Sequence, residues 1–217
     1  MNINTEVAQK IAESLLQIKA IKLQPQKPFT WASGLKSPIY CDNRISLSHP
    51  HIRTYIRQKL AEVVQDDFGS VEMISGVATA GIPQGVLVAQ DLGLPFTYVR
   101  SSTKEHGRQN LIEGEVVSGQ RVVVIEDLVS TGQSSLKAVE ALRAAECNVV
   151  GLVSIFSYGF EEAAQNFAEA KCEMVTLCDF ETLIEVAARF NYIHQDDSEI
   201  LMDFRLDPAG WAAKNNL

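Results

Sequence analysis

Apolar residues along this chain follow two different periods, which predict helices and strands in alternation. Near the N-terminus, apolar residues three and four positions apart predict a helix over residues 7–21 with one apolar face. Its apolar positions are Val7, Ile11, Leu15 and Ile18. A second helix is predicted from Pro50 to about residue 66, because Ser48 can cap it and proline suits a first helical turn.

Between these helices, residues 27–44 contain two short aromatic and β-branched runs on either side of Ser33 and Gly34. Runs of this kind around a glycine predict a hairpin or a pair of edge strands. Such a small unit beside a larger domain is a candidate hood over a site. We therefore expect residues 1–45 to form an N-terminal helix and hood.

From residue 71 onward, short apolar runs typical of strands alternate with longer runs typical of helices. In chain order they cover residues 71–77, 82–92, 96–99, 122–125, 134–145, 149–156, 161–168, 174–177 and 180–190. This alternation predicts an α/β core over residues 46–217, with a mostly parallel twisted sheet flanked by helices. Asp207 and Pro208 predict the start of a short terminal helix.

Composition and charge exclude several classes of protein. A chain of 217 residues can bury a self-sufficient core. Its apolar runs are too short to span a bilayer, so we expect no membrane partner and a cytoplasmic location. A net charge of −8 argues against a general nucleic-acid surface. The four cysteines show no C-x-x-C spacing, which gives little support to zinc or a disulfide framework.

One long polar segment interrupts the alternation. Residues 100–114 lack a clean period and exceed most connections in compact domains, so we expect a lid loop over residues 101–114. Its basic residues favour anion binding in an acidic chain: Arg100, Lys104, His106 and Arg108. From length alone, a surface loop without a function is equally compatible with this segment.

Residues 122–135 read VVVIEDLVSTGQSS, an apolar strand that runs into two acids and a turn of small hydroxyl residues. Ligands in open α/β sheets lie outside the carboxyl ends of strands, where we expect Glu126 and Asp127. Carboxylates can accept hydrogen bonds from sugar hydroxyls, and amides at a helix N-terminus bind phosphate. The pattern therefore predicts a site for a phosphorylated sugar. An acidic N-cap is the simpler alternative, but a cap requires only one such residue.

Other phosphate motifs fit poorly. Gly76 and Gly81 have the Walker spacing, but Ile82 and Pro83 stand where lysine and serine or threonine are required. No G-x-G-x-x-G follows a predicted strand, so sites for nucleoside triphosphates and dinucleotides are weakly supported.

Residues 122–135 resemble the phosphoribosyl-pyrophosphate signature of the type I phosphoribosyltransferases. Residues 29–44, FTWASGLKSPIYCDNR, and residues 104–107, KEHG, narrow the resemblance to the orotate phosphoribosyltransferases within that family. The resemblance implies the type I fold with a small N-terminal hood. It also implies a transferase that moves phosphoribosyl from phosphoribosyl pyrophosphate to N1 of orotate. The products would be orotidine 5-monophosphate and pyrophosphate, in de novo pyrimidine synthesis.

The resemblance also implies roles for individual residues. Lys104, His106 and Asp127 would act in catalysis. The residues implied for phosphoribosyl pyrophosphate are Arg100, Lys104, His106, Thr79, Ala80, Gly81, Glu126, Asp127, Leu128, Val129, Ser130, Thr131, Gly132, Gln133 and Ser134. Those implied for orotate are Ser33, Gly34, Tyr40, Arg44 and Ser130. Mg²⁺ is the implied cofactor, held mainly by substrate rather than by a metal site of the protein. A homodimer is implied, because the family's lid acts on the neighbouring subunit's site.

The chain departs from the family at a few positions. Some members carry lysine where Ala32, Ala80 and Ser101 stand, and an arginine that contacts orotate near Tyr158 and Gly159. Backbone amides of residues 78–81 are candidate replacements for the lysine contacts to pyrophosphate. Arg44 or Lys36 is a candidate replacement for the orotate contact.

Two other functions stay open at this point. A purine phosphoribosyltransferase would share the phosphate signature but not the hood of residues 29–44. A regulator that senses phosphoribosyl pyrophosphate would need a partner-binding element, and the roughly 25 residues before the hood are too few for a typical DNA-binding module.

Overall fold

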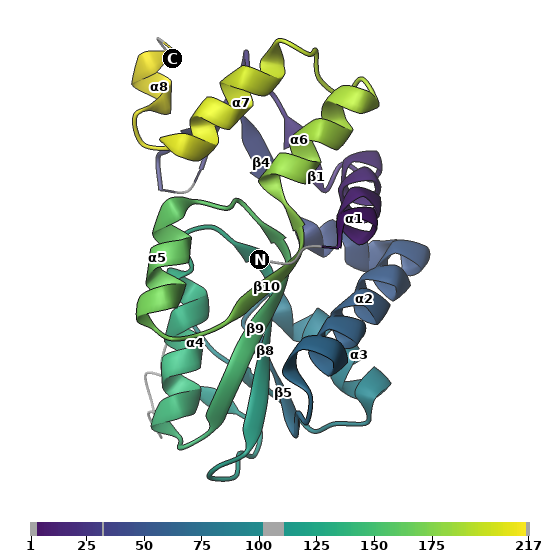
Figure 1. Cartoon of the computed structure of the whole chain (residues 1–217), viewed down its shortest axis with the longest axis vertical. Helices are drawn as coiled ribbons and strands as arrows, with labels where there is room; N and C mark the ends of the chain where they lie inside the picture. Colours follow the sequence, from purple (N-terminus) through teal and green to yellow (C-terminus); the bar gives the residue numbers. More distant parts are fainter. Residues whose placement is uncertain (1–3, 32, 102–110, 216–217) are drawn as a thin grey trace.

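The computed structural model describes residues 4–31, 33–101 and 111–215 (Figure 1). Its centre is a six-stranded sheet in the order β10-β9-β8-β5-β6-β7. The strands are β5 (Met73–Val77), β6 (Phe96–Val99), β7 (Ile112–Glu113), β8 (Arg121–Val129), β9 (Asn148–Ser157) and β10 (Met174–Asp179). All pairs are parallel except β6 with β7. The predicted α/β fold with a mostly parallel sheet is confirmed.

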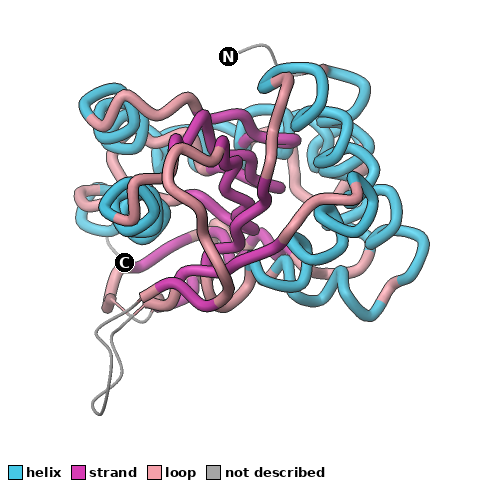
Figure 2. Tube along the Cα trace, turned by 90° about the horizontal axis from the view of Figure 1, so that it is seen from below, coloured by secondary structure: helices cyan, strands magenta, loops and turns pink. Residues whose placement is uncertain are grey.

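Helices cover both faces of this sheet, as Figure 2 shows for the strands between two helical layers. One layer contains α1 (Thr5–Gln17), α2 (Pro50–Phe68) and α3 (Gly81–Leu92); the other contains α4 (Gln133–Ala144) and α5 (Glu161–Glu169). Val123 and Ile125 enter the first core, whereas Val122 and Val124 enter the second. Burial on both faces explains the unbroken apolar run in β8. Within the described ranges, no helix is long and apolar enough to cross a membrane.

Elements from the N-terminal and C-terminal parts of the chain lie together above the sheet in Figure 1. The N-terminal part contributes β1 (Ile21–Leu23), β2 (Phe29–Thr30), β3 (Lys36–Ser37), β4 (Ile39–Cys41) and the 3-10 helix η1 (Asn43–Ser48). The C-terminal part contributes α6 (Phe180–Arg189), α7 (Asp197–Leu206) and α8 (Trp211–Lys214). β2 and β3 form the predicted antiparallel hairpin, and β1 pairs with β4.

Aromatic rings join this hood to the C-terminal helices. The Trp31 ring centroid lies 5.3 Å from that of Tyr158 and 6.0 Å from that of Phe204 in α7. Phe204 in turn lies edge-on to Trp211, with ring centroids 5.6 Å apart. Because aromatic pairs in such geometries stabilise packing, segments from opposite ends of the chain hold the hood in place.

Several local predictions were wrong. The first helix ends at Gln17 rather than near residue 21, where β1 begins. His49, not Ser48, is the N-cap of α2, because Ser48 is the last residue of η1. The predicted lid ends in the edge strand β7, and α7 was not predicted because its apolar residues follow no clean helical period.

The largest correction concerns β8. The apolar run predicted a strand that ends at residue 125, but β8 continues to Val129. Pairing with β9 extends it, because Glu126 pairs with Ser154 and Leu128 with Phe156. The two acids therefore lie inside the strand, near its carboxyl end.

Candidate active site

The two acids of β8 have different environments. The side chain of Glu126 points to the α4 side of the sheet and is only 5% exposed. Its carboxylate accepts hydrogen bonds from the Ser135 hydroxyl (3.0 Å) and from the backbone N–H of Asp127 (3.0 Å). Asp127 is half-buried, and its carbonyl oxygen accepts a 2.7 Å hydrogen bond from the Asn43 side chain. Asp127 is therefore the acid that remains open to a ligand.

Burial also separates the protonation of these acids. Burial raises the pKa of Glu126 well above the usual range of a glutamate, and the neighbouring Asp127 carboxylate raises it further. Burial raises the pKa of Asp127 as well, although the nearby Arg44 opposes that change. Adjacent carboxylates do not ionise independently, and the more deeply buried one retains its proton to higher pH. We expect Glu126 to be that residue.

Glu126→Gln should therefore raise the melting temperature at alkaline pH. The amide oxygen can accept from the Asp127 N–H, and the amide NH2 can donate to the Ser135 oxygen, so both contacts remain while the buried charge is removed. The pKa of Glu126 is higher in the folded state than in the unfolded state. Below about pH 4 the residue is protonated in both states and costs no stability, and the free energy of unfolding falls as pH rises towards and through the folded-state pKa. Thermal melts of both proteins from pH 4 to 9 should diverge accordingly, by about 2 to 4 °C per kcal/mol. A difference independent of pH would contradict this assignment.

A tight turn joins β8 to α4 and forms the predicted phosphate loop, residues 130–134. Gly132 has a φ of 81°, and a Cβ there would lie 2.7 Å from the Phe167 ring, so only glycine fits. The Asn166 side chain donates a 2.9 Å hydrogen bond to the Thr131 carbonyl and holds the loop. The first amides of α4 follow at Gln133 and Ser134, where a helix N-terminus favours an anion. Leu128 and Val129 belong to the strand instead, and the Val129 side chain is buried.

The loop of residues 78–81 lies directly against β8. A Cβ on Gly81 would lie 2.5 Å from the Ile125 carbonyl oxygen, and one on Gly76 would lie 2.9 Å from the Gly81 oxygen. The Ala78 N–H donates to the Val99 carbonyl (2.9 Å), and the peptide bond from Ala78 to Thr79 is cis. Glycine at these positions therefore allows the predicted pyrophosphate loop to approach the strand of the acid pair.

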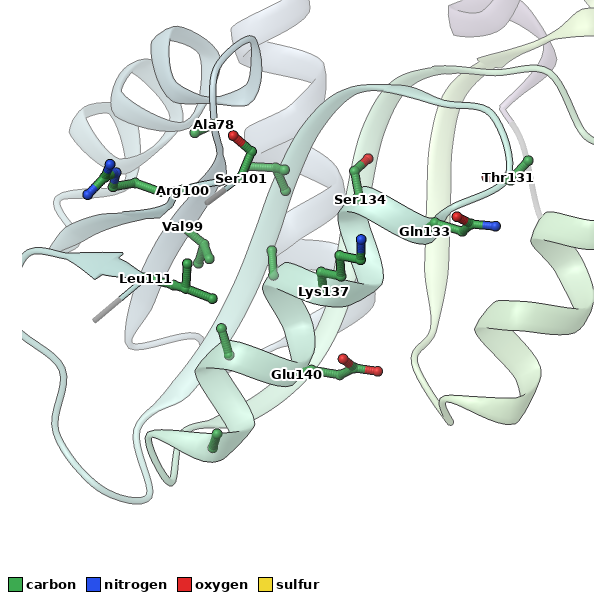
Figure 3. A pocket seen from close by; sticks show the side chains of 14 residues that line it. Ala78, Val99, Arg100, Ser101, Leu111, Thr131, Gln133, Ser134, Lys137 and Glu140 are labelled. Atoms are coloured by element: carbon green, nitrogen blue, oxygen red, sulfur yellow. The ribbon is translucent and has the colours of Figure 1, made fainter. Parts of the chain in front are cut away.

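These two loops border one cavity of about 670 Å³ (Figure 3). Ala78, Arg100, Thr131, Gln133 and Ser134 line it, and the binding roles expected for the last four stay predictions. Ser101 and Lys137 also line it and were not among the predicted contacts. The spacing from Ser134 to Lys137 could have identified the lysine, because residues three apart on a helix share a face.

Arg100 is positioned at this cavity by its neighbours. Its Nη1 lies 3.6 Å from a carboxylate oxygen of Glu113 in β7, and its backbone N–H donates to the Leu111 carbonyl at 2.8 Å. The Arg100 Nη1 atom is buried and has no hydrogen-bond partner among the described residues. An anion at the cavity could therefore satisfy this group.

The predicted hood residues lie in and near β4: Gly34 in the turn between β2 and β3, Tyr40 in β4, and Arg44 in η1. Tyr40 is 39% exposed, and its ring centroid is 5.7 Å from that of Phe29. Gly34 has a φ of 86° in the hairpin turn. Arg44 makes two hydrogen bonds to Asp42, at 2.6 and 2.9 Å, so it carries a bound carboxylate in this state.

The structure links hood and acid pair through a residue that was not predicted. Asn43 is buried and binds the Asp127 carbonyl, which connects the start of η1 to β8. The only signal in the sequence was its position after Asp42, which also favours an ordinary cap. Lys104 and His106 lie outside the described residues.

Comparison with known proteins identifies the family of this chain. A family model for the phosphoribosyl transferase domain matches residues 46–190. The chain belongs to this family. Curated relatives of this phosphoribosyl transferase include the orotate phosphoribosyltransferases of Phocaeicola vulgatus and Listeria monocytogenes. The first is 55% identical over 93% of this chain and 95% of its own, and the second 51% identical over 94% and 98%.

Solved structures agree with these relatives. The crystal structure of orotate phosphoribosyltransferase from Aeropyrum pernix has a TM-score of 0.74 and 29% identity, over 84% of this chain and 99% of that one. Leishmania donovani UMP synthase has a TM-score of 0.77 and 25% identity, over 91% of this chain and 42% of that one. The predicted resemblance, fold and class of enzyme are confirmed.

Proposed function

We propose that this phosphoribosyl transferase is an orotate phosphoribosyltransferase that uses phosphoribosyl pyrophosphate and forms orotidine 5-monophosphate for pyrimidine synthesis. The observation that carries the proposal is the cavity bordered by the loops of residues 78–81 and 130–134, the second of which directly follows the strand of the acid pair. A second support comes from the relatives at 55% and 51% identity. Both are named orotate phosphoribosyltransferase, and the similarity covers almost their whole length, so it includes the hood.

Different residues bind different parts of phosphoribosyl pyrophosphate. Asp127 accepts hydrogen bonds from the ribose hydroxyls, and the amides and hydroxyls from Ser130 to Ser134 bind the 5-phosphate. Arg100 and the amides of residues 78–81 bind pyrophosphate, and Lys137 adds a cation at the same cavity. Glu126 is buried and does not face the ligand; it stabilises the start of α4, next to the phosphate loop, by accepting a hydrogen bond from Ser135.

The chemistry requires charge stabilisation more than a nucleophile. As the bond from C1 to pyrophosphate breaks, the ribose gains oxocarbenium character and negative charge gathers on the leaving group. Preorganised cations and amides around that group lower the barrier. Orotate N1 supplies the attacking electron pair, so no covalent enzyme intermediate is required.

Mg²⁺ fits this set of residues as an ion bound with the substrate. In the part of the chain that the structure describes, no three His, Cys, Asp or Glu side chains form a group that could hold a metal. Mg²⁺ in proteins commonly takes one or two carboxylates together with substrate phosphates and water. Asp127 is the carboxylate available for this, and the bound ion would supply positive charge to the leaving pyrophosphate.

The decisive assay follows orotate absorbance in the presence of phosphoribosyl pyrophosphate and Mg²⁺. The purified protein should consume orotate and should not replace it with adenine, guanine or xanthine. Consumption of a purine instead would favour the purine enzymes of this family. Binding of phosphoribosyl pyrophosphate without consumption of any base would favour a regulator.

The proposed enzyme is a homodimer in which Lys104 reaches the partner's site. Lys104→Ala and Asp127→Ala homodimers would then have every site damaged once. After the two inactive proteins are refolded together, about half of the dimers should be mixed, and about a quarter of all sites should regain full activity. Native mass spectrometry would confirm mixing. Mixed dimers without recovered orotate consumption would show that Lys104 serves its own subunit or is not catalytic.

A further inference from the structure

Tyr158 lies at the ligand-binding end of the sheet, where neither the fold nor the assigned roles require its hydroxyl. It follows β9 directly, and its backbone N–H donates to the Val129 carbonyl of β8 at 3.0 Å. The preceding residue, Ser157, pairs with Val129 in the parallel ladder. Tyr158 is thus one strand away from the acid pair, at the edge where open α/β sheets bind ligands.

The ring of Tyr158 is held by other aromatic rings and is only 2% exposed. It stacks on Phe160 with an interplanar angle of 11° and a centroid distance of 5.3 Å, and it meets Phe156 edge-on at 5.4 Å. The hood residue Trp31 covers it at 5.3 Å. These contacts fix the direction of the ring, and they use only its apolar surface.

The hydroxyl, by contrast, has no partner among the described residues. Buried tyrosines usually hydrogen-bond their hydroxyl, yet that of Tyr158 makes no hydrogen bond to any residue that the structure describes. The oxygen is not completely enclosed by the described residues, so it is not sealed off from a ligand. A donor held rigidly at the edge of a binding site, without a partner, is available to a ligand.

The surroundings of the hydroxyl indicate which part of the ligand it meets. Burial raises the pKa of Tyr158 well above its usual value, and Cys41, Asp127 and Tyr40 raise it further. The hydroxyl is therefore protonated at neutral pH, and the ring that carries it lies beside Trp31 of the hood and one strand away from Asp127. The group attached to C1 of the ribose, which is the acceptor base, would occupy that space.

We propose that the Tyr158 hydroxyl donates a hydrogen bond to an oxygen of orotate and is a specificity-determining residue for the acceptor base. The inference rests on the proposed function and adds to it a contact that none of the predicted orotate residues supplies. Arg44 is already bound to Asp42 in this state, which leaves Tyr158 as an uncommitted donor beside the hood.

Tyr158→Phe tests the proposal, because the ring contacts remain and only the hydroxyl is lost. A hydrogen bond to an anionic substrate corresponds to a loss of roughly 10-fold or more, so kcat/KM for orotate should fall by at least that factor. The KM for phosphoribosyl pyrophosphate should stay within about twofold. The melting temperature should stay the same or rise, because an unpaired buried hydroxyl does not stabilise the fold.

Tyr55→Phe in α2 is the matched control, and it should leave both substrates unaffected. The wild-type protein is assayed first, since its failure to consume orotate would overturn the proposed function and this contact with it. If the wild type is active and Tyr158→Phe keeps its kcat/KM for orotate, only the contact is overturned. An equal rise in both KM values, or a marked fall in melting temperature, would also overturn it by showing a structural role.

Discussion

Replacing Asp127 with alanine is expected to lower kcat/KM for phosphoribosyl pyrophosphate by roughly 10- to 150-fold. Hydrogen bonds to a charged group are worth ~1.5 to 3 kcal/mol, and the truncation removes the exposed acid of the pair. The fold should survive, because Asp127 is half-buried and its backbone carbonyl, not its side chain, binds Asn43. Steady-state kinetics with either substrate varied would measure the loss.

Asp42→Ala provides a matched control for this experiment. Asp42 is another acid near the hood, and its carboxylate binds Arg44 and the N-terminus of η1. It should affect phosphoribosyl pyrophosphate much less than Asp127→Ala does. A change below about threefold for Asp127→Ala would reject the ribose-binding role.

Gly81→Ala is expected to lower kcat/KM by about 100-fold, because a displacement near 1 Å in a binding loop has that effect on catalysis. The added Cβ would lie 2.5 Å from the Ile125 carbonyl oxygen, and its three nearest neighbours are all backbone atoms of β8, which have little room to yield. The loop of residues 78–81 must therefore move away from β8. Overpacking of this kind also destabilises by about 1 to 3 kcal/mol, so thermal melts should accompany the kinetics.

Gly93→Ala separates the two effects of that variant. Gly93 ends α3 with a φ of 66° and has open space around it, so alanine there strains the backbone without displacing a neighbour. We expect a loss of stability near 1 kcal/mol with unchanged kinetics. Gly81→Ala with kinetics as normal as those of Gly93→Ala would show that the loop does not contact substrate.

The local pattern of apolar residues predicted much of the fold, because helices and strands repeat their buried positions with different periods. The alternating runs located β5, β6, β9 and β10, and α3, α5 and α6 to within two residues at each end. The failures arose where few residues carry the signal. β1 and β7 have three and two residues, and they exist because a neighbouring strand offers hydrogen bonds. A pairing partner far away in the chain leaves no periodic trace.

The candidate site also has residues that the local sequence predicted and residues that it did not. The stretch of acids, glycine and hydroxyl residues was enough to predict a phosphorylated sugar, since those groups have few other uses together at the end of a strand. Ser101, Lys137 and Asn43 were not predicted, because each is an ordinary residue until the fold brings it to the cavity or the acid pair.

The sequence by itself determined the chemistry of this protein: an acid pair, a glycine turn with hydroxyls, and the alternation that forms a parallel sheet. Only the tertiary structure decided which groups are available to a ligand. Pairing with β9 extends β8 through the acids, and Ser135 binds the inward-pointing Glu126. The ring of Trp31 covers Tyr158, whose hydroxyl has no partner among the described residues. Backbone period and turn chemistry are local properties, whereas burial, pKa and an unsatisfied donor depend on neighbours that are distant in the chain.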